Sequence, residues 1–195
     1  MIKSKRLLEI LQDILDKEEI SENDLKKIND LTLNKKKLNG LENDIELTEL
    51  KYFSNLKTLM IANFKVDAQI IEIINNQKSL LAVQFSRCEF ENIIPVNQNI
   101  KYLIVDGCQN FNYNLINNNE TIKIIGEKIE ISSPNNLNKT KELFLQNCDV
   151  EKSENLCYCQ NLNSLNLDGS KFEEGIRKKL NKNIQISYKE QYHPM

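Results

Sequence analysis

Cysteine and histidine side chains are the residues of this sequence whose types could support metal binding or catalysis. Cys157 and Cys159 lie two residues apart in the segment LCYCQ, a spacing at which two thiolates can bind one metal ion. The chain contains one histidine, His193, so it cannot supply a zinc site with two histidines. We therefore expect core or half-exposed thiols and a solvated histidine, with a metal- or thiol-dependent enzyme as the least favoured hypothesis.

The glycines and turn sequences give no further sign of catalysis. The five glycines are scattered at positions 40, 107, 126, 169 and 175, so the sequence has no glycine-rich phosphate-binding loop. The segments DGC (106–108) and DGS (168–170) are typical of turns after a strand, because glycine adopts positive φ easily. The sequence predicts no enzyme, no cofactor and no small-molecule substrate.

The charged residues nearly balance, with 26 Lys and Arg against 28 Asp and Glu and a formal net charge of −2. The chain therefore lacks the global basic field that favours nucleic acid. Two short basic runs, 35–37 and 177–179, have acidic neighbours and are typical of solvated surface. The alternative is that these runs contact phosphates.

The sequence also predicts a compartment, the cytoplasm, or the nucleus in a eukaryote. Glu9, Asp13 and Asp16 interrupt the first apolar stretch, which is unlike a signal peptide. No apolar run approaches the roughly 18 residues of a membrane-spanning helix, so we expect no membrane partner. Five cysteines, an odd number, fit a reducing compartment better than a disulfide framework.

The elements that carry these residues are indicated by a recurring, uneven spacing of apolar residues. In NLNSLNLDGSKF (161–172), Leu162, Leu165, Leu167 and Phe172 are separated by 3, 2 and 5 residues, which fits neither a helix nor a plain strand. The same pattern recurs along the chain. The first strand residue of each copy is predicted to be Leu31, Leu59, Val83, Leu103, Ile122, Leu143, Leu165 and Ile184, at steps of 28, 24, 20, 19, 21, 22 and 19 residues.

This pattern resembles the leucine-rich repeat, L-x-x-L-x-L-x-x-N/C-x-L. The match covers Leu80–Phe90 and Thr140–Val150 with Cys at the N/C position, and Leu162–Phe172 with Ser170 there. The resemblance implies an α/β fold, a right-handed solenoid of about eight coils. It also implies a parallel concave β-sheet and a mixed helical and extended convex side.

Elementary geometry supports this interpretation. Two apolar residues separated by one residue point to the same face of a short strand, and flanking apolar residues turn inward where the chain bends. A single coil cannot close its own core, so successive coils stack. Cys88, Cys108 and Cys148 at the N/C position are therefore predicted to be buried structural thiols.

The solenoid is predicted to span residues 28–190, after an N-terminal helical cap (1–27) and before a C-terminal tail (191–195). An apolar stripe at helical spacing indicates the first cap helix, and Ser21 with Asp24 resembles a capping box that opens a second. The alternative is that the stripe binds a partner helix or a membrane surface. The stripe comprises Leu7, Leu8, Ile10, Leu11, Ile14 and Leu15.

The segments between strands are predicted to form the convex side. Residues 67–77 and 173–182 have apolar residues at helical spacing and suit short helices. The segment 91–99 contains Pro95 and suits an extended or 3₁₀ passage. The long first interval has room for a helix or a longer connection.

The concave face is the predicted binding surface. Its central row holds Thr32, Met60, Gln84, Ile104, Lys123, Phe144, Asn166 and Gln185, and the preceding row holds Asp30, Thr58, Ala82, Tyr102, Thr121, Glu142, Ser164 and Asn183. Exposed aromatic, Met and Arg side chains are enriched at protein interfaces. The predicted partner-binding residues are Met60, Arg87, Tyr102, Ile104, Lys123 and Phe144. The alternatives are ordinary scattered exposure, or a register shift of one residue that buries them.

These observations predict a non-enzymatic protein-interaction module that binds a protein partner through the concave face. The alternative is a subunit of a larger ribonucleoprotein assembly whose basic runs contact phosphates. Salt dependence separates the two, because phosphate contacts lose affinity steeply as salt rises.

Overall fold

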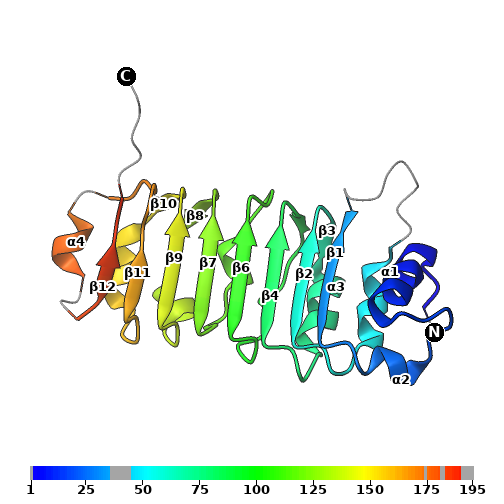
Figure 1. Ribbon diagram of the computed structural model, residues 1–195. Helices are drawn as coiled ribbons and strands as arrows, with labels where there is room; N and C mark the ends of the chain where they lie inside the picture. Colours follow the sequence, from blue (N-terminus) through cyan, green and yellow to red (C-terminus); the bar gives the residue numbers. More distant parts are fainter. Residues whose placement is uncertain (1, 36–44, 174, 181–182, 190–195) are drawn as a thin grey trace.

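The computed structural model describes residues 2–35, 45–173, 175–180 and 183–189, with the side chain of residue 177 left aside. Eight strands form one parallel sheet in chain order: β1 (Asp30–Asn34), β2 (Thr58–Ala62), β4 (Ala82–Ser86), β6 (Tyr102–Asp106), β7 (Thr121–Ile125), β9 (Glu142–Gln146), β11 (Ser164–Asn166) and β12 (Gln185–Ser187). Figure 1 shows the strands side by side with the connections behind them. The crossovers have the right-handed sense that parallel strands favour. The predicted right-handed solenoid is confirmed.

The sheet register follows the predicted repeat in seven of the eight copies. Leu31, Leu59, Val83, Leu103, Ile122, Leu143 and Leu165 are paired in sequence across the sheet. The last copy was wrong, because Leu165 pairs with Ile186 and not with Ile184. The segment IQIS offers two apolar residues at strand spacing, and the structure uses the first as a buried turn residue. Ser187 therefore replaces Gln185 in the central row, and Gln185 replaces Asn183 in the row before it.

Each central strand ends in the same turn. The fourth residue after the first inward strand residue has a left-handed backbone, with φ between 53° and 70°, at Asn63, Arg87, Gly107, Gly126, Asn147 and Gly169. Four turns lead into short strands: β3 (Lys65–Asp67), β5 (Glu89–Glu91), β8 (Lys128–Glu130) and β10 (Asp149–Glu151). These strands pair in parallel as β3 with β5 and β8 with β10. A left-handed residue therefore turns the chain away from the main sheet in coil after coil.

The next residue of each turn is buried, and in the last five turns these residues form a ladder, which we define as Cys88, Cys108, Glu127, Cys148 and Ser170. Ladder side chains link successive coils because each can bond to the coil before it. Cys148 Sγ donates to Ile124 O at 3.4 Å, and Ser170 Oγ donates to Leu145 O at 2.7 Å. Ser170 Oγ also accepts from Cys148 N at 2.9 Å. The three ladder cysteines are buried, as predicted.

The convex side combines helices of two kinds, as predicted. It contains η2 (Leu47–Tyr52), α3 (Ala68–Asn75), η3 (Tyr113–Leu115), η4 (Pro134–Leu137), η5 (Ser153–Tyr158) and α4 (Ile176–Lys179), where η marks a 3₁₀ helix. Asp67 caps α3 by accepting from Ile70 N at 3.0 Å. The segment 93–97 around Pro95 has neither helix nor strand. The first long interval contains η2, and its residues 36–44 lie outside the described part.

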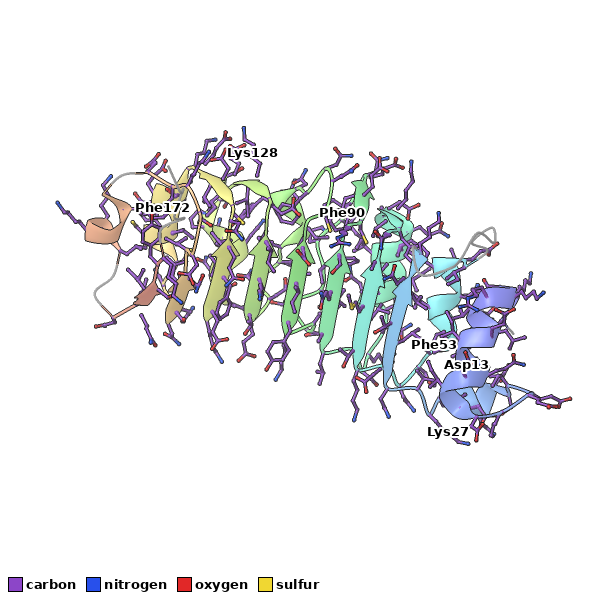
Figure 2. All side chains as sticks on the ribbon, turned by 45° about the horizontal axis from the view of Figure 1, so that its top comes forward. Asp13, Lys27, Phe53, Phe90, Lys128 and Phe172 are labelled. Atoms are coloured by element: carbon purple, nitrogen blue, oxygen red, sulfur yellow. The ribbon has the colours of Figure 1, made fainter. Side chains whose placement is uncertain are left out.

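Two helices lie at the N-terminal end of the sheet, beside β1 (Figure 1), as expected for a cap. Leu7 and Leu11 of α1 (Lys5–Leu15) are buried, whereas Ile14 is 51% exposed. Glu49 of η2 holds the start of α1, since its carboxylate accepts from Ser4 N at 3.2 Å. The predicted capping box is present at α2 (Glu22–Leu25). In Figure 2, Phe53 lies between this end and the first coils.

Candidate functional site

The outward face of the sheet carries an apolar patch at its centre. The structure places Tyr102 and Ile104 on β6, Lys123 on β7 and Phe144 on β9, with Ile104, Lys123 and Phe144 adjacent in one row of the register. Tyr102 is 47% exposed, and the other three are half-buried by one another. Their inward neighbours are fully buried. The alternative register, which would bury these side chains, is therefore wrong.

Ile125 completes this surface and was missed by the sequence reasoning. It lies between Asp106 and Gln146 in the third outward row and is half-buried. The run IKII contained the signal, because a third apolar residue follows the inward Ile122 and Ile124. We define the central patch as Tyr102, Ile104, Lys123, Ile125 and Phe144.

The two remaining predicted residues lie away from the central patch. Met60 lies on β2, and Gln84 separates it from Ile104 in the central row. Arg87 is exposed in the turn that follows the carboxyl end of β4, and its φ is 53°. The structure therefore brings four of the six predicted residues together.

Polar and acidic side chains surround the central patch. Glu142 beside Phe144 accepts from Thr121 Oγ1 at 3.1 Å, and Gln84 Nε2 donates to Ser86 Oγ at 3.0 Å. Within the part of the chain that the structure describes, Lys123 forms no ion pair. It lies between the apolar side chains of Ile104 and Phe144. An apolar centre with a polar, hydrogen-bonded rim is the usual composition of a protein interface, whereas a lysine at the centre is uncommon.

The surroundings of Cys157 and Cys159 disfavour their thiolate forms. Cys159 is buried, its Sγ lies 3.9 Å from Asn155 O, and burial raises its pKa to about 12. Burial also raises the pKa of the half-exposed Cys157. Thiolates are the forms that bind metals and attack substrates. No group of three metal-ligating side chains occurs within the described ranges, and His193 lies outside them.

Glu127 is the one carboxylic acid of the ladder, and sequence reasoning did not single it out. Its carboxyl is buried, and Oε1 accepts a hydrogen bond from Cys108 N. Burial raises its pKa to about 7, which this hydrogen bond opposes and nearby Asp106 reinforces. It also lines a cavity of about 450 Å³ with Phe111, Tyr113 and Glu130.

No described helix is long and apolar enough to cross a membrane.

Comparison with known proteins supports the fold and not a particular activity. No family model and no curated protein matches the sequence. Among solved structures, internalin C2 from Listeria monocytogenes is similar, with a TM-score of 0.53 and 13% identity over 95% of this chain and 93% of that one. Internalin F from the same organism has a TM-score of 0.59 and 15% identity over 95% of this chain. The chain spans 55% of that internalin's length.

Proposed function

We propose that this chain, whose fold is a leucine-rich repeat solenoid, is a non-enzymatic module that binds a protein partner through the outward face of its sheet. The observation that carries the proposal is the central patch of Tyr102, Ile104, Lys123, Ile125 and Phe144. These side chains come from three adjacent strands and lie on a face that no other described element covers. Large apolar and aromatic groups gathered on one open face suit a partner surface.

The sheet also provides a physical basis for affinity. Backbone hydrogen bonds fix β6, β7 and β9 in one register, and buried residues on their inner side fix each strand from behind. The outward side chains are therefore ordered before a partner arrives. A preordered surface loses little conformational entropy on association, which is one of the costs that lower affinity.

The chemistry of the patch describes the partner surface in general terms. The half-buried side chains of Ile104, Ile125 and Phe144 favour apolar groups, and the Tyr102 ring gives an exposed aromatic contact. Lys123 at the centre favours a carboxylate among those groups, because a charge in an apolar surface needs a counter-charge when water is removed. We expect a partner with apolar residues around one or two acidic ones.

Affinity capture with matched variants tests this proposal. The wild type, Phe144→Glu and Ile94→Glu are immobilised, and proteins captured from the native cell lysate are compared by quantitative mass spectrometry. Ile94 is 37% exposed on the convex side and controls for an added surface charge. We expect a partner that Ile94→Glu retains and Phe144→Glu loses, with thermal midpoints close to wild type. Equal capture by all three proteins would contradict the proposal.

Tyr102→Ala provides a second, milder variant. Tyr102 is exposed, so its truncation removes contact area without opening the core, and hot-spot aromatic side chains contribute about 2 kcal/mol or more to binding. We expect the same partner to be weakened by at least tenfold. A large loss of thermal stability would instead show that the ring has a structural role.

The proposal places the protein in the cytoplasm, because all five cysteines are free thiols, as is usual in a reducing compartment. The ribonucleoprotein alternative has no support from the similar structures, and residues 36 and 37 of its first basic run lie outside the described part. Capture at rising salt distinguishes the two functions. Binding through the central patch should change little with salt, whereas phosphate contacts would give a steep loss.

A further inference from the structure

We propose a second binding surface, the groove between α1 and α2, which takes a basic amphipathic helix from a protein partner. It lies at the N-terminal end of the solenoid, beside β1, whereas the central patch lies on β6, β7 and β9 (Figure 1). The two surfaces use different residues and are independent of each other. The chain would then connect two partners.

The floor of the groove is apolar. Ile2, Leu8, Ile20 and Leu25 line a hollow of about 540 Å³. Leu25 is buried, while the other three are only partly covered by the described chain. An aliphatic side chain placed there would remove apolar surface from water on both partners, which favours binding.

The rim of the groove is acidic. Glu18, Glu19 and Glu22 line the hollow, and no lysine or arginine lines it. None of the three carboxylates has an ion pair within the described ranges. A visiting segment with Lys or Arg beside its apolar residues would meet complementary charge on association.

Two lysines close in sequence to this rim are paired with another carboxylate. Lys17 Nζ lies 2.7 Å from Asp24 Oδ1, and Lys27 Nζ lies 2.9 Å from the same oxygen. Both lysines are thus held by one buried carboxylate of α2. The Asp24 cluster holds two of the six basic side chains of residues 1–27, and the three glutamates of the rim face solvent.

The groove walls are fixed before a partner binds. Ser21 and Asp24 form the reciprocal capping box that sets the start of α2. Glu49 holds the backbone of Lys3 and Ser4 at the start of α1. A helix in a preformed groove is a common mode of peptide recognition, with apolar anchors at helical spacing.

The charge distribution favours a protein helix over a lipid surface. Amphipathic helices that lie on membranes carry Lys and Arg on their polar face, which attract anionic headgroups. Here the polar residues beside the apolar floor are glutamates, which anionic headgroups would repel. The apolar groove and its rim therefore suit a basic peptide.

A labelled peptide tests the proposal directly. The probe is a fluorescein-labelled, 18-residue peptide of Leu and Lys at amphipathic helical spacing, and its control peptide has Glu in place of every Lys. Binding to the full chain is measured by fluorescence anisotropy. Methyl signals of Leu8, Ile20 and Leu25 are followed by NMR. We expect the Lys peptide to bind and shift these methyl signals, and the Glu peptide to bind at least tenfold more weakly.

Two triple variants separate local from general charge effects. Glu18→Lys/Glu19→Lys/Glu22→Lys reverses the rim, and Glu72→Lys/Asp149→Lys/Glu173→Lys makes the same charge change at exposed sites elsewhere. We expect at least a tenfold loss of Lys-peptide affinity in the first variant and less than twofold in the second. Equal losses, or methyl shifts confined to Ile104 and Ile125 of the central patch, would overturn the proposal.

Further measurements separate peptide binding in the groove from partner binding on the sheet and from lipid binding. Phe144→Glu should bind the Lys peptide as the wild type does, even if the sheet proves to bind no partner. Vesicles of phosphatidylcholine and phosphatidylglycerol should not cosediment with the protein. Cosedimentation that Ile20→Asp abolishes, with its α1 and α2 amide signals unchanged, would assign the groove to lipid and overturn the proposal.

Discussion

The cap and the coils each bury a carboxyl group, and they treat it in opposite ways. Asp24 in the cap accepts hydrogen bonds from Lys17, Ser21 and Lys27, which hold the pKa of its carboxyl far below the ordinary 3.8. Glu127 in the coils is buried, and this burial raises its pKa from 4.5 to about 7. The cap therefore stabilises a charge, whereas the coils disfavour one.

This difference follows from the positions that each architecture offers. Short helices project lysines around their surface, so a buried carboxylate in the cap finds counter-charges within one or two turns. A ladder position faces the backbone of neighbouring coils, which supplies an N–H on one side and a carbonyl on the other. Cysteine and serine can both donate and accept there, whereas an ionised carboxylate can only accept. Glu127 suits the ladder best when it is protonated.

The largest expected effect comes from the packing between coils. Phe85 is fully buried, and its ring meets Phe90 edge-on at a centroid distance of 5.3 Å. Phe85→Ala should lower the free energy of unfolding by about 3–5 kcal/mol, because it leaves a cavity between stacked coils. Urea unfolding followed by circular dichroism measures this loss. Ile14→Ala on the exposed side of the cap is the control and should change stability by less than about 0.5 kcal/mol.

A small loss of unfolding free energy in Phe85→Ala would contradict this contrast between the coils and the cap. It would mean that the coils do not share a close-packed core, and that the cap contributes as much stability as the stacked strands. We expect Phe85→Ala to lower the free energy of unfolding more than Leu11→Ala in the cap does.

Glu127→Gln should give the next largest effect, and its sign depends on pH. The raised pKa of Glu127 means that the folded state binds its proton more tightly than the unfolded chain does. This contribution is fully present below pH 4.5 and is lost as the pH rises through about 7. We expect Glu127→Gln to match the wild type near pH 4.5 and to be more stable by about 1–3 kcal/mol at pH 8.

The control for this prediction is Glu130→Gln, in the same coil. Glu130 is exposed and forms an ion pair with Lys152, which lowers its pKa. Its replacement should not stabilise the protein at pH 8. If the free energies of unfolding of wild type and Glu127→Gln differ by the same amount from pH 5 to pH 8, the ladder tolerates a charge and the prediction is wrong.

Much of the fold was predictable because each coil repeats one physical requirement. Leucine, isoleucine or valine at the paired strand positions fixed the register of seven strands, and the capping box fixed the start of α2. Only the last copy was wrong, because Ile184 and Ile186 both lie at strand spacing. The copy at Ile122 kept its predicted register although Asn119 occupies an apolar turn position, where it is buried because Nδ2 donates to Ile100 O at 2.7 Å. Such compensation depends on a neighbouring coil and leaves no local signal.

The candidate site was less predictable than the fold. Tyr102, Ile104, Lys123 and Phe144 followed from strand alternation, because outward rows continue once the inward row is known. Ile125 was missed because only the first two outward rows were followed. The groove of the cap could not be predicted, since it depends on how α1 and α2 pack and on where Asp24 directs the lysines.

Asp24→Asn tests how much the buried carboxylate of the cap contributes to stability. The depressed pKa of Asp24 contributes stability above pH 3.8, and that contribution is lost as the pH falls below this value. We expect Asp24→Asn to melt at a lower temperature at pH 7, with a difference that shrinks below pH 3.8. The effect should be smaller than that of Glu127→Gln because Lys17 and Lys27 remain partly solvated. Thermal melts from pH 2.5 to 7 measure it, and a constant difference across this range would contradict the ion-pair interpretation.

The smallest expected effect concerns Arg87, which adopts φ 53° where three other coils have glycine and two have asparagine. A side chain with a Cβ is strained in this conformation by about 1 kcal/mol, so Arg87→Gly should raise the free energy of unfolding by about 0.5–1 kcal/mol. Gly107→Ala makes the reverse change in the next coil and should destabilise by a similar amount. Its new Cβ would lie 3.9 Å from Arg87 Cγ, so steric contact does not complicate the result.

If Arg87→Gly is more stable and also weakens capture of the sheet-binding partner, the strain at Arg87 is maintained for binding. If it gains stability and captures the partner normally, the binding surface ends at the central patch.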